Sequence, residues 1–304
     1  MKTAVAVIIF NRPEKTKILF ESIKKYKPNK LFIISDGPRK RNLSDKDQVK
    51  ISREIFKNIT WKCRVLTNYS NKNLGTKNRI ISGINWVFQN VEEAIFLEDD
   101  CIPLKEFFPY MEQMLNKYRT NLKIGSVCGS NLFNYKQKNK ENYFFSKYQH
   151  CWGWGTWKNR WQKLDRNLKT LEKTKKNRLL KVYLGSYRAY LYWHWKLNKI
   201  KKNKLDSWAY IWAYTGFIKR YLHIIPKENL IINVGFDGSA TRTKKNKYDF
   251  KFMHNIKFKF PINHPCKIKV NNFYDKNCED KIYSKSFKDR IFWLFKSISL
   301  LNFF

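Results

Sequence analysis

The sequence lacks the signatures of several common protein classes. No stretch reaches the roughly 20 apolar residues that a membrane-spanning helix needs, and the most apolar terminal stretch, residues 291–304, is interrupted by Lys296. The pattern G-x-x-x-x-G-K-[ST] is absent, and no G-x-G-x-x-G follows the first apolar run. The phosphate cradles of P-loop NTPases and of dinucleotide-dependent dehydrogenases are therefore missing. A diphosphate, if one binds, must be held by a metal ion and basic side chains.

Cysteine is also scarce. The six cysteines are scattered without a C-x-x-C pair, so we expect neither a metal finger nor a disulfide framework, and a reducing compartment is predicted. The first apolar run, residues 4–10, leads directly into Asn11, Arg12 and Pro13 without a small-residue cleavage site. We therefore interpret it as a buried strand and not as a signal peptide.

Acidic residues are few. The 304 residues include 24 Asp and Glu against 62 Lys and Arg, which gives a net charge of +38. A hydrophobic content of 43% and an aromatic content of 17% exclude a disordered basic tail. The charge is compatible with nucleic acid, an anionic membrane face, a phosphorylated substrate or a compositional bias toward Lys and Asn. Composition alone leaves these four interpretations open.

The first 130 residues alternate short apolar runs with amphipathic patterns, which is typical of βαβ units and a mainly parallel sheet. We expect strands at residues 4–10, 31–35, 63–67, 94–97 and 124–127. We expect helices at residues 14–26, 45–58, 76–90 and 105–118. Nearly every predicted strand ends in a polar cluster, and ligands of open α/β sheets bind at the carboxyl ends of the strands.

The rest of the chain is aromatic and basic, and residues 158–204 are mostly helical in pattern. Because no internal repeat and no Pro/Gly/Ser-rich linker occurs, we expect this half to complete the sheet of one domain over residues 1–243. Residues 244–304 then form a basic C-terminal extension. Its apolar end is predicted to be either an interfacial helix on an anionic membrane or a terminal helix packed on the domain.

Three consecutive acids, Glu98, Asp99 and Asp100, end the fourth predicted strand. Mg²⁺ and Mn²⁺ prefer carboxylate oxygens and are typically shared between one or two carboxylates and the phosphates of a substrate. Such an ion can neutralise a diphosphate leaving group. The alternative is an acidic loop that complements the dipole of the following helix.

Four motifs at the ends of predicted strands occur together in a fixed order. They are Phe10-Asn11-Arg12-Pro13, Ser35-Asp36-Gly37, Asn73-Leu74-Gly75 followed by Arg79, and Leu97-Glu98-Asp99-Asp100. In this order they resemble the GT-A nucleotide-sugar glycosyltransferases, and among them the bacterial family-2-like enzymes and the N-acetylglucosaminyltransferase I group, which carries a similar Glu-Asp-Asp motif. The resemblance covers about residues 4–240.

The resemblance implies a fold and a division of the domain. The fold is α/β: a Rossmann-like, mainly parallel mixed sheet flanked by helices, with a basic, aromatic-rich and helical C-terminal half. Residues 1–130 would form the nucleotide-sugar-binding half, and residues 131–243 would form the acceptor-side half. The donor would be a nucleoside-diphosphate sugar, with a UDP-sugar favoured.

Roles for single residues of the first half follow from the same resemblance. Asp36 would contact the nucleotide base or ribose, and Asn11 and Arg12 would line the nucleotide pocket. Arg79, matched by its offset from the glycine turn, would reach the diphosphate. At the acidic motif, Glu98 and Asp99 would face the nucleotide sugar. Asp100, the last acid, would ligate Mn²⁺ or Mg²⁺.

A tryptophan-rich segment in the second half resembles the Gly-Trp segment that follows the metal motif in these enzymes. Its rings, those of Trp152, Trp154 and Trp157, alternate with glycines, as in a surface that stacks on sugars. The alternative is that these tryptophans belong to the core. Residues 235–242 resemble the loop that closes over a bound nucleotide sugar, with Arg242 available for phosphate, and a plain turn is the alternative.

Asp206 falls where the resembling enzymes place an Asp-(x)-Trp element whose carboxylate is the catalytic base. An inverting transfer needs one such carboxylate to take the proton of the acceptor hydroxyl. The alternative is a helix N-cap, because Asp206 precedes an apolar aromatic stretch that begins with Ser207 and Trp208.

Together these predictions describe a metal-dependent, inverting glycosyltransferase that moves a sugar from a nucleoside-diphosphate sugar to a glycan or glycolipid in bacterial surface polysaccharide synthesis. It would be cytoplasmic, with a peripheral contact on the anionic inner face of the cell membrane. One alternative is a nucleic-acid-binding protein, although the acidic motif would repel a phosphate backbone, so nucleic acid is not expected as a partner. The other is a non-catalytic sugar- or membrane-binding relative of the fold.

Overall fold

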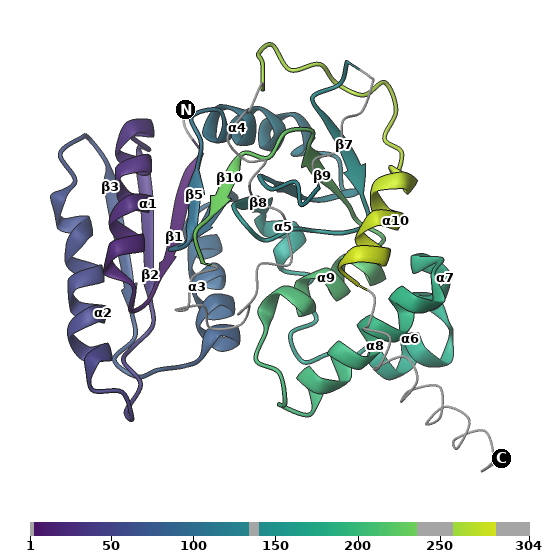
Figure 1. The fold of residues 1–304 in the computed structure, drawn as a ribbon, viewed down its shortest axis with the longest axis horizontal. Helices are drawn as coiled ribbons and strands as arrows, with labels where there is room; N and C mark the ends of the chain where they lie inside the picture. Colours follow the sequence, from purple (N-terminus) through teal and green to yellow (C-terminus); the bar gives the residue numbers. More distant parts are fainter. Residues whose placement is uncertain (1–2, 134–139, 236–257, 284–304) are drawn as a thin grey trace.

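The computed structural model describes residues 3–133, 140–235 and 258–283, and the structural statements below refer to these ranges (Figure 1). Eight strands form one mixed sheet in the order β3-β2-β1-β4-β8-β6-β9-β7. They are β1 (Ala4–Ile9), β2 (Lys30–Ser35), β3 (Arg64–Tyr69), β4 (Glu93–Glu98), β6 (Ile124–Cys128), β7 (Tyr143–Ser146), β8 (Trp154–Trp157) and β9 (Leu222–Pro226). A separate antiparallel pair is formed by β5 (Cys101–Pro103) and β10 (Ile231–Asn233).

Helices surround the sheet in two groups. The helices of the first group connect the parallel strands: α1 (Pro13–Tyr26), α2 (Ser44–Glu54) with the 3₁₀ turn η1 (Ile55–Asn58), α3 (Thr76–Asn90) and α4 (Phe107–Tyr118). The helices of the second group follow β8: α5 (Lys158–Trp161), α6 (Leu171–Lys176), α7 (Leu179–Leu184), α8 (Tyr187–Lys201), α9 (Trp208–Lys219) and α10 (Asn272–Lys281).

The strands β3, β2, β1 and β4 are mutually parallel. The chain runs outward from β1 through β2 to β3 and then crosses back, so that β4 pairs with the other side of β1. This reversal is the topological switch point of a doubly wound sheet, where ligands bind beyond the carboxyl ends of the strands. In the other half, β8 lies antiparallel between β4 and β6.

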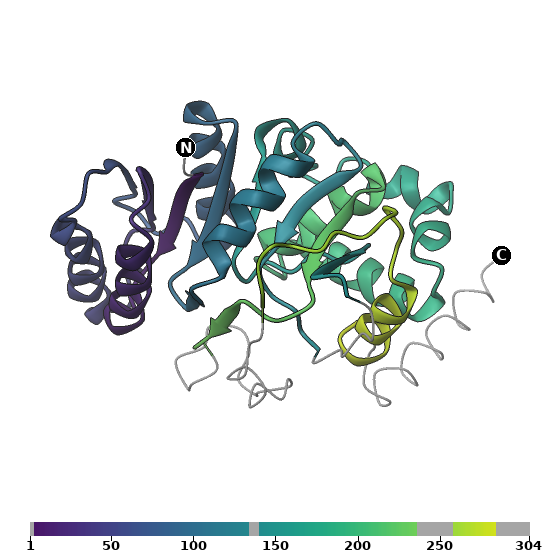
Figure 2. The ribbon, with the colours of Figure 1, turned by 90° about the horizontal axis from the view of Figure 1, so that it is seen from above.

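Side chains of the central strands alternate between two hydrophobic cores, as the period of two in a strand requires. Along β1, Ala6 and Ile8 face the core that includes α3, α8 and α9, whereas Val7 and Ile9 face the core that includes α1 and α4. Figure 2 shows helices on both sides of the sheet. A sheet covered on both faces explains why its strands are continuous apolar runs in the sequence.

The predicted fold class is confirmed: the protein is α/β, with a mixed sheet flanked by helices. All five predicted strands and all four predicted helices are present, with α2 and η1 sharing the helix expected at residues 45–58. The strands β5, β7, β8, β9 and β10 were not predicted. Three strands of the second half, β7, β8 and β9, lie in the same sheet as β1.

Part of the expected C-terminal extension packs on the domain. Phe258 and Ile262 belong to one core, and Tyr274 and Cys278 of α10 belong to the other. These four residues of the expected extension therefore pack against the preceding part of the chain. Residues 284–304, which include the predicted interfacial tail, lie outside the described residues. Within the described ranges, no helix is both long enough and apolar enough to cross a membrane.

Candidate active site

The acidic motif lies at the switch point of the sheet. Glu98 is the last residue of β4 and pairs in register with Ile8 of β1. The backbone N–H of Asp99 donates to the Ile8 carbonyl at 3.1 Å. This pairing places Asp99 and Asp100 directly beside Arg12, which follows the end of β1. The sheet thus brings together two predicted donor-site motifs that are more than 80 residues apart in the chain.

Arg12 binds both aspartates of the motif. Its Nε donates to Asp99 Oδ2 at 3.2 Å, its Nη2 donates to Asp99 Oδ1, and its Nη1 donates to Asp100 Oδ2 at 3.0 Å. Burial raises the pKa of Asp99 to about 6, and the Arg12 charge opposes that rise. Burial also lowers the pKa of Arg12, but the two carboxylates outweigh it and the net shift is upward. One guanidinium thus faces two carboxylates, and Glu98 is a further acid next to them.

Asp100 is the acid of this motif that is predicted to bind a metal ion. Its side chain is partly exposed, and the Cys101 thiol donates to Oδ1 at 3.6 Å. Gly235 packs closely on the other oxygen, which also accepts Arg12 Nη1, because a Cβ at position 235 would lie 2.4 Å from Asp100 Oδ2. Across the described ranges, no group of three or more His, Cys, Asp or Glu side chains could hold a metal by itself. The role of Asp100 as a metal ligand stays a prediction, in which the cation would be shared with substrate phosphates.

Asp36 anchors the loop that follows β3 to the end of β2. Its carboxylate accepts the backbone N–H groups of Gly37 and Leu74 at 2.9 Å each and that of Gly75 at 3.1 Å. Burial raises the pKa of Asp36, and these backbone donors oppose the rise. A Cβ at Gly37 would come within 2.6 Å of the Lys72 backbone, so only glycine permits this close approach. The predicted contact between Asp36 and a nucleotide stays a prediction.

Two other predicted donor-site residues hold neighbouring segments in place. Arg79 is buried, and its Nη2 donates to the carbonyl and to the side-chain oxygen of Asn68 at 2.5 and 2.6 Å. Asn11 donates to Asp45 Oδ1 at 2.7 Å, and Arg39 donates to Asp45 Oδ2 at 2.6 Å. Asn11 therefore joins the end of β1 to the start of α2. The bonds of Arg79 thus go to Asn68 on β3 and to Ser82 of its own helix, α3.

Asp206 lies at the N-terminus of α3. Its Oδ1 accepts the backbone N–H of Lys77 at 3.1 Å, and its Oδ2 would lie 3.1 Å from a Cβ at Gly75. A carboxylate at this end of a helix is favoured by the helix dipole. The N-cap of α9 is Ser207 and not Asp206. The alternative of an N-cap on the following helix is therefore wrong, and the side chain is instead an exposed carboxylate next to the loop that Asp36 anchors.

Two of the three predicted stacking tryptophans are core residues. Trp154 and Trp157 are only 1% and 2% exposed, so neither offers a ring face to a sugar. Trp154 packs against Trp161, Trp208 and Trp212. The three-residue spacing puts Trp154 and Trp157 on opposite faces of β8, and both faces are covered. Trp152 is partly exposed, and its role in sugar stacking stays a prediction. Arg242 lies outside the described residues.

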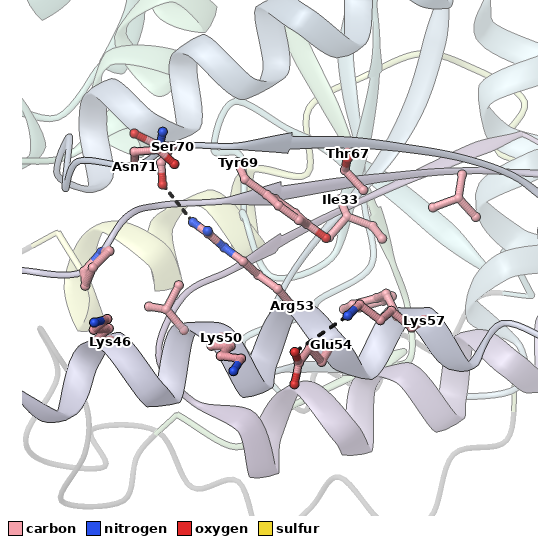
Figure 3. A pocket seen from close by; sticks show the side chains of 14 residues that line it. Ile33, Lys46, Lys50, Arg53, Glu54, Lys57, Thr67, Tyr69, Ser70 and Asn71 are labelled. Carbon is pink, nitrogen blue, oxygen red and sulfur yellow. Dashed lines mark hydrogen bonds and ion pairs between the residues drawn. The ribbon is translucent and has the colours of Figure 1, made fainter.

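A cavity of about 590 Å³ opens between α2 and β3 (Figure 3). Arg53 reaches across it from α2 and donates to the Ser70 carbonyl at 2.8 Å and to the Asp36 carbonyl at 3.0 Å. The cavity is also lined by Lys46, Lys50 and Lys57. The acidic motif and Asp206 are not among its lining residues, so the cavity does not contain them. Sequence reasoning missed it, although basic residues at positions 46, 50, 53 and 57 recur with helical spacing.

Comparison with known proteins gives partial likenesses only. No family model matches the chain, and no curated protein matches it. Among solved structures, 4-diphosphocytidyl-2C-methyl-D-erythritol synthase from Anaerococcus prevotii DSM 20548 is 12% identical over 52% of this chain and 72% of its own, with a TM-score of 0.32. HddC from Yersinia pseudotuberculosis is 12% identical over 42% and 57%, with a TM-score of 0.28. UDP-glucose pyrophosphorylase complexed with UDP-glucose is 9% identical over 54% and 79%, with a TM-score of 0.31.

Proposed function

We propose that this protein is a metal-dependent, inverting glycosyltransferase that uses a nucleoside-diphosphate sugar. The observation that carries the proposal is the cluster of Glu98, Asp99 and Asp100 at the switch point, next to Arg12. Open α/β sheets bind nucleotides at this position. A second carboxylate from a distant part of the chain, Asp206, lies at the N-terminus of α3 and supplies the base that such a reaction requires.

The donor side of the proposed site is negatively charged before any ligand binds. Arg12 compensates one charge of the Asp99 and Asp100 pair, which leaves one negative charge on these three residues. A nucleoside diphosphate is itself anionic, so its binding here requires an added cation. Asp100 would hold Mn²⁺ or Mg²⁺ together with diphosphate oxygens, and that ion would neutralise the departing diphosphate.

The chain's own residues shape the rest of the site. Arg12 keeps the carboxylates of Asp99 and Asp100 together in a fixed arrangement. Asp36 holds the loop over residues 70–75, which forms one wall of the nucleotide pocket, and Asn11 fixes the opposite loop through Asp45. The nucleotide then lies between two loops whose backbones are fixed by buried carboxylates.

The proposed transfer is a single displacement at the anomeric carbon. The acceptor hydroxyl oxygen forms the new bond to that carbon while the bond from the carbon to the diphosphate oxygen breaks. The hydroxyl proton passes to Asp206, and the bonding electron pair leaves with the diphosphate. The Lys77 N–H bond to Asp206 Oδ1 orients the carboxylate. The acceptor is a glycan or glycolipid, and the reaction belongs to bacterial surface polysaccharide synthesis on the cytoplasmic side.

The test is a panel of nucleotide sugars, including UDP-sugars, incubated with the full chain and with Mn²⁺, Mg²⁺ or EDTA. We expect metal-dependent release of the nucleoside diphosphate from one donor, and loss of both metal dependence and release in Asp100→Asn. Glu21→Gln, which changes an exposed acid on α1, is the matched control and should behave as the wild type. Donor binding that needs no metal and survives Asp100→Asn would reject the metal role. Tight binding of duplex or single-stranded nucleic acid with a steep salt dependence, and no donor turnover, would favour the nucleic-acid alternative.

A further inference from the structure

A basic surface lies at the end of the molecule opposite β3 and α2. Every charged residue from position 173 to position 205 is Lys or Arg. The segment forms the end of α6, all of α7 and all of α8, which are grouped together in Figure 1. Glu172, the acid that precedes it, is paired with Lys201 at 2.9 Å. Residues 173–205 therefore contain no Asp or Glu that could compensate their positive charge.

The short helix α7 presents an apolar face to solvent. Leu180 and Leu184 point into the core and are buried. On the other side, Leu179 is 45% exposed and Val182 is 71% exposed, and they are three residues apart and so lie on one face. Tyr187, at the start of α8, is 58% exposed. Apolar side chains that stay in water do not stabilise the fold. The exposure of three of them within one short segment therefore indicates a binding surface.

Basic side chains surround these apolar ones. Lys181 Nζ lies 5.3 Å from the centre of the Tyr187 ring, so apolar and basic groups are in direct contact. The exposed basic residues of the same stretch are Lys175, Lys176, Arg178, Lys181 and Arg188. We call these five residues, together with Leu179, Val182 and Tyr187, the α7 patch.

We propose that the α7 patch docks on the surface of an anionic lipid bilayer. At such a surface the apolar side chains enter the boundary between headgroups and acyl chains while lysines and arginines meet lipid phosphates. A nucleic acid would satisfy the basic residues but would leave Leu179 and Val182 in water. The interleaving of aliphatic and basic side chains therefore favours lipid. This inference goes beyond the proposed function and does not depend on it.

The α7 patch is connected along the chain to the proposed site through α8. The helix α8 ends at Lys201, and the chain then reaches Asp206, five residues later. The α7 patch and the proposed base thus belong to one continuous part of the chain, packed against α9. If the proposed function holds, the docking surface and the acceptor side of the site are connected through α8, whose 15 residues separate them.

The experiment is co-sedimentation of the full chain with vesicles of phosphatidylcholine mixed with phosphatidylglycerol, and with vesicles of phosphatidylcholine alone. We expect binding to the anionic vesicles only. Leu179→Ser combined with Val182→Ser should lower the partition coefficient at least about ten-fold. Leu122→Ser is the matched control, because Leu122 is 64% exposed but lies between α4 and β6, and it should bind as the wild type.

Charge is tested separately. Each basic residue near an anionic surface contributes about five-fold, so Lys175→Gln, Lys176→Gln and Lys181→Gln together should lower partitioning on the order of 100-fold. The matched control removes three exposed lysines of α1, Lys17, Lys24 and Lys25, and should have a far smaller effect. Donor turnover without vesicles is expected to be the same in all of these variants, so failure of this proposal and failure of the proposed function give different results.

Three results would overturn the proposal. The first is equal binding of the α7 double variant and of Leu122→Ser. The second is retained binding of the α7 variants together with loss of binding in Phe292→Ser combined with Trp293→Ser, which would assign the contact to the C-terminal tail. The third is binding of duplex DNA that depends on the three lysines but not on Leu179 and Val182, without vesicle binding.

Discussion

Asp36 and Asp206 lie on either side of one residue, Gly75. The Asp36 carboxylate accepts the Gly75 N–H at 3.1 Å, and Asp206 Oδ2 would be 3.1 Å from a Cβ at the same residue. Gly75 also immediately precedes α3, whose Lys77 N–H binds Asp206. The loop that forms the nucleotide side of the proposed site and the carboxylate proposed as the base are thereby fixed relative to each other.

Replacement of Gly75 by alanine should disturb both the loop that Asp36 anchors and the position of the Asp206 carboxylate. Gly75 has φ 77° and ψ 159°, a region used essentially by glycine alone, and a Cβ there costs about 1–3 kcal/mol. The Cβ would also press on Asp206. We expect Gly75→Ala to lower the free energy of unfolding by that amount and to reduce transfer more than donor binding, as measured by urea denaturation and by transfer kinetics. In Gly185→Ala, a Cβ at φ 71° would meet nothing within 4 Å, so this control should lose some stability but no activity. Equal activity losses in the two variants would contradict the argument.

The Asp206→Asn variant tests the proposed base directly. An amide can still accept the Lys77 N–H, so the loop and helix should keep their arrangement, but the amide cannot take a proton. We expect transfer to fall by about 100- to 10,000-fold, with donor affinity and metal dependence unchanged in a binding assay. Glu21→Gln serves again as the exposed-acid control, and the anomeric configuration of the wild-type product reports inversion. Retained transfer in Asp206→Asn would move the base to another residue.

The parallel half of the fold could be predicted because each of its strands and helices has a pattern within a short stretch of the sequence. Each strand of that half is a short apolar run, and the amphipathic period of each connecting helix is visible in the sequence. The position of the acidic motif was predictable for the same reason, because strand ends in an open α/β sheet mark the ligand edge. Insertion of β8 between β4 and β6 was not predictable, because β8 has four residues and its pairing depends on distant partners.

The side-chain partners within the site could not be read from the sequence. The bond between Asp206 and Lys77 joins residues 129 positions apart, and that between Arg12 and Asp99 joins residues 87 positions apart. Nothing in a linear pattern distinguishes an arginine that binds a nucleotide from one that binds two aspartates. For Trp154 and Trp157 a signal did exist, since residues three apart in a strand lie on opposite faces and cannot form one stacking surface.

Removal of Arg12 should destabilise the folded state, because Asp99 and Asp100 then lose the guanidinium that binds both of them. Asp99 is buried, whereas Asp100 is partly exposed, and loss of the partner of a buried charge such as Asp99 typically costs about 3–5 kcal/mol. We expect Arg12→Met to lower the free energy of unfolding by about this amount, and Mn²⁺ to raise the unfolding midpoint of this variant more than that of the wild type. Arg41→Met, at an exposed arginine, is the control. A decrease in the free energy of unfolding of less than about 1 kcal/mol would mean that Asp99 and Asp100 do not depend on Arg12 for charge compensation in the folded state.

Stability should depend on pH through Asp275, which is buried between α10 and β7. Its carboxylate accepts Ser146 Oγ at 2.5 Å and the Lys147 N–H at 3.1 Å, and burial raises its pKa from 3.8 to about 6. Because the folded state holds this proton more tightly than the unfolded state, the contribution of Asp275 is complete below about pH 4 and is lost as pH rises through 6. The shift corresponds to about 3 kcal/mol. In Asp275→Asn, urea denaturation should show a flatter profile between pH 4 and 7, whereas Asp280→Asn, at an exposed position of α10, should keep the wild-type slope. An unchanged slope of unfolding free energy against pH in Asp275→Asn would show that other groups set the pH dependence. Asp99, whose pKa is also raised to about 6, would then be the next residue to replace.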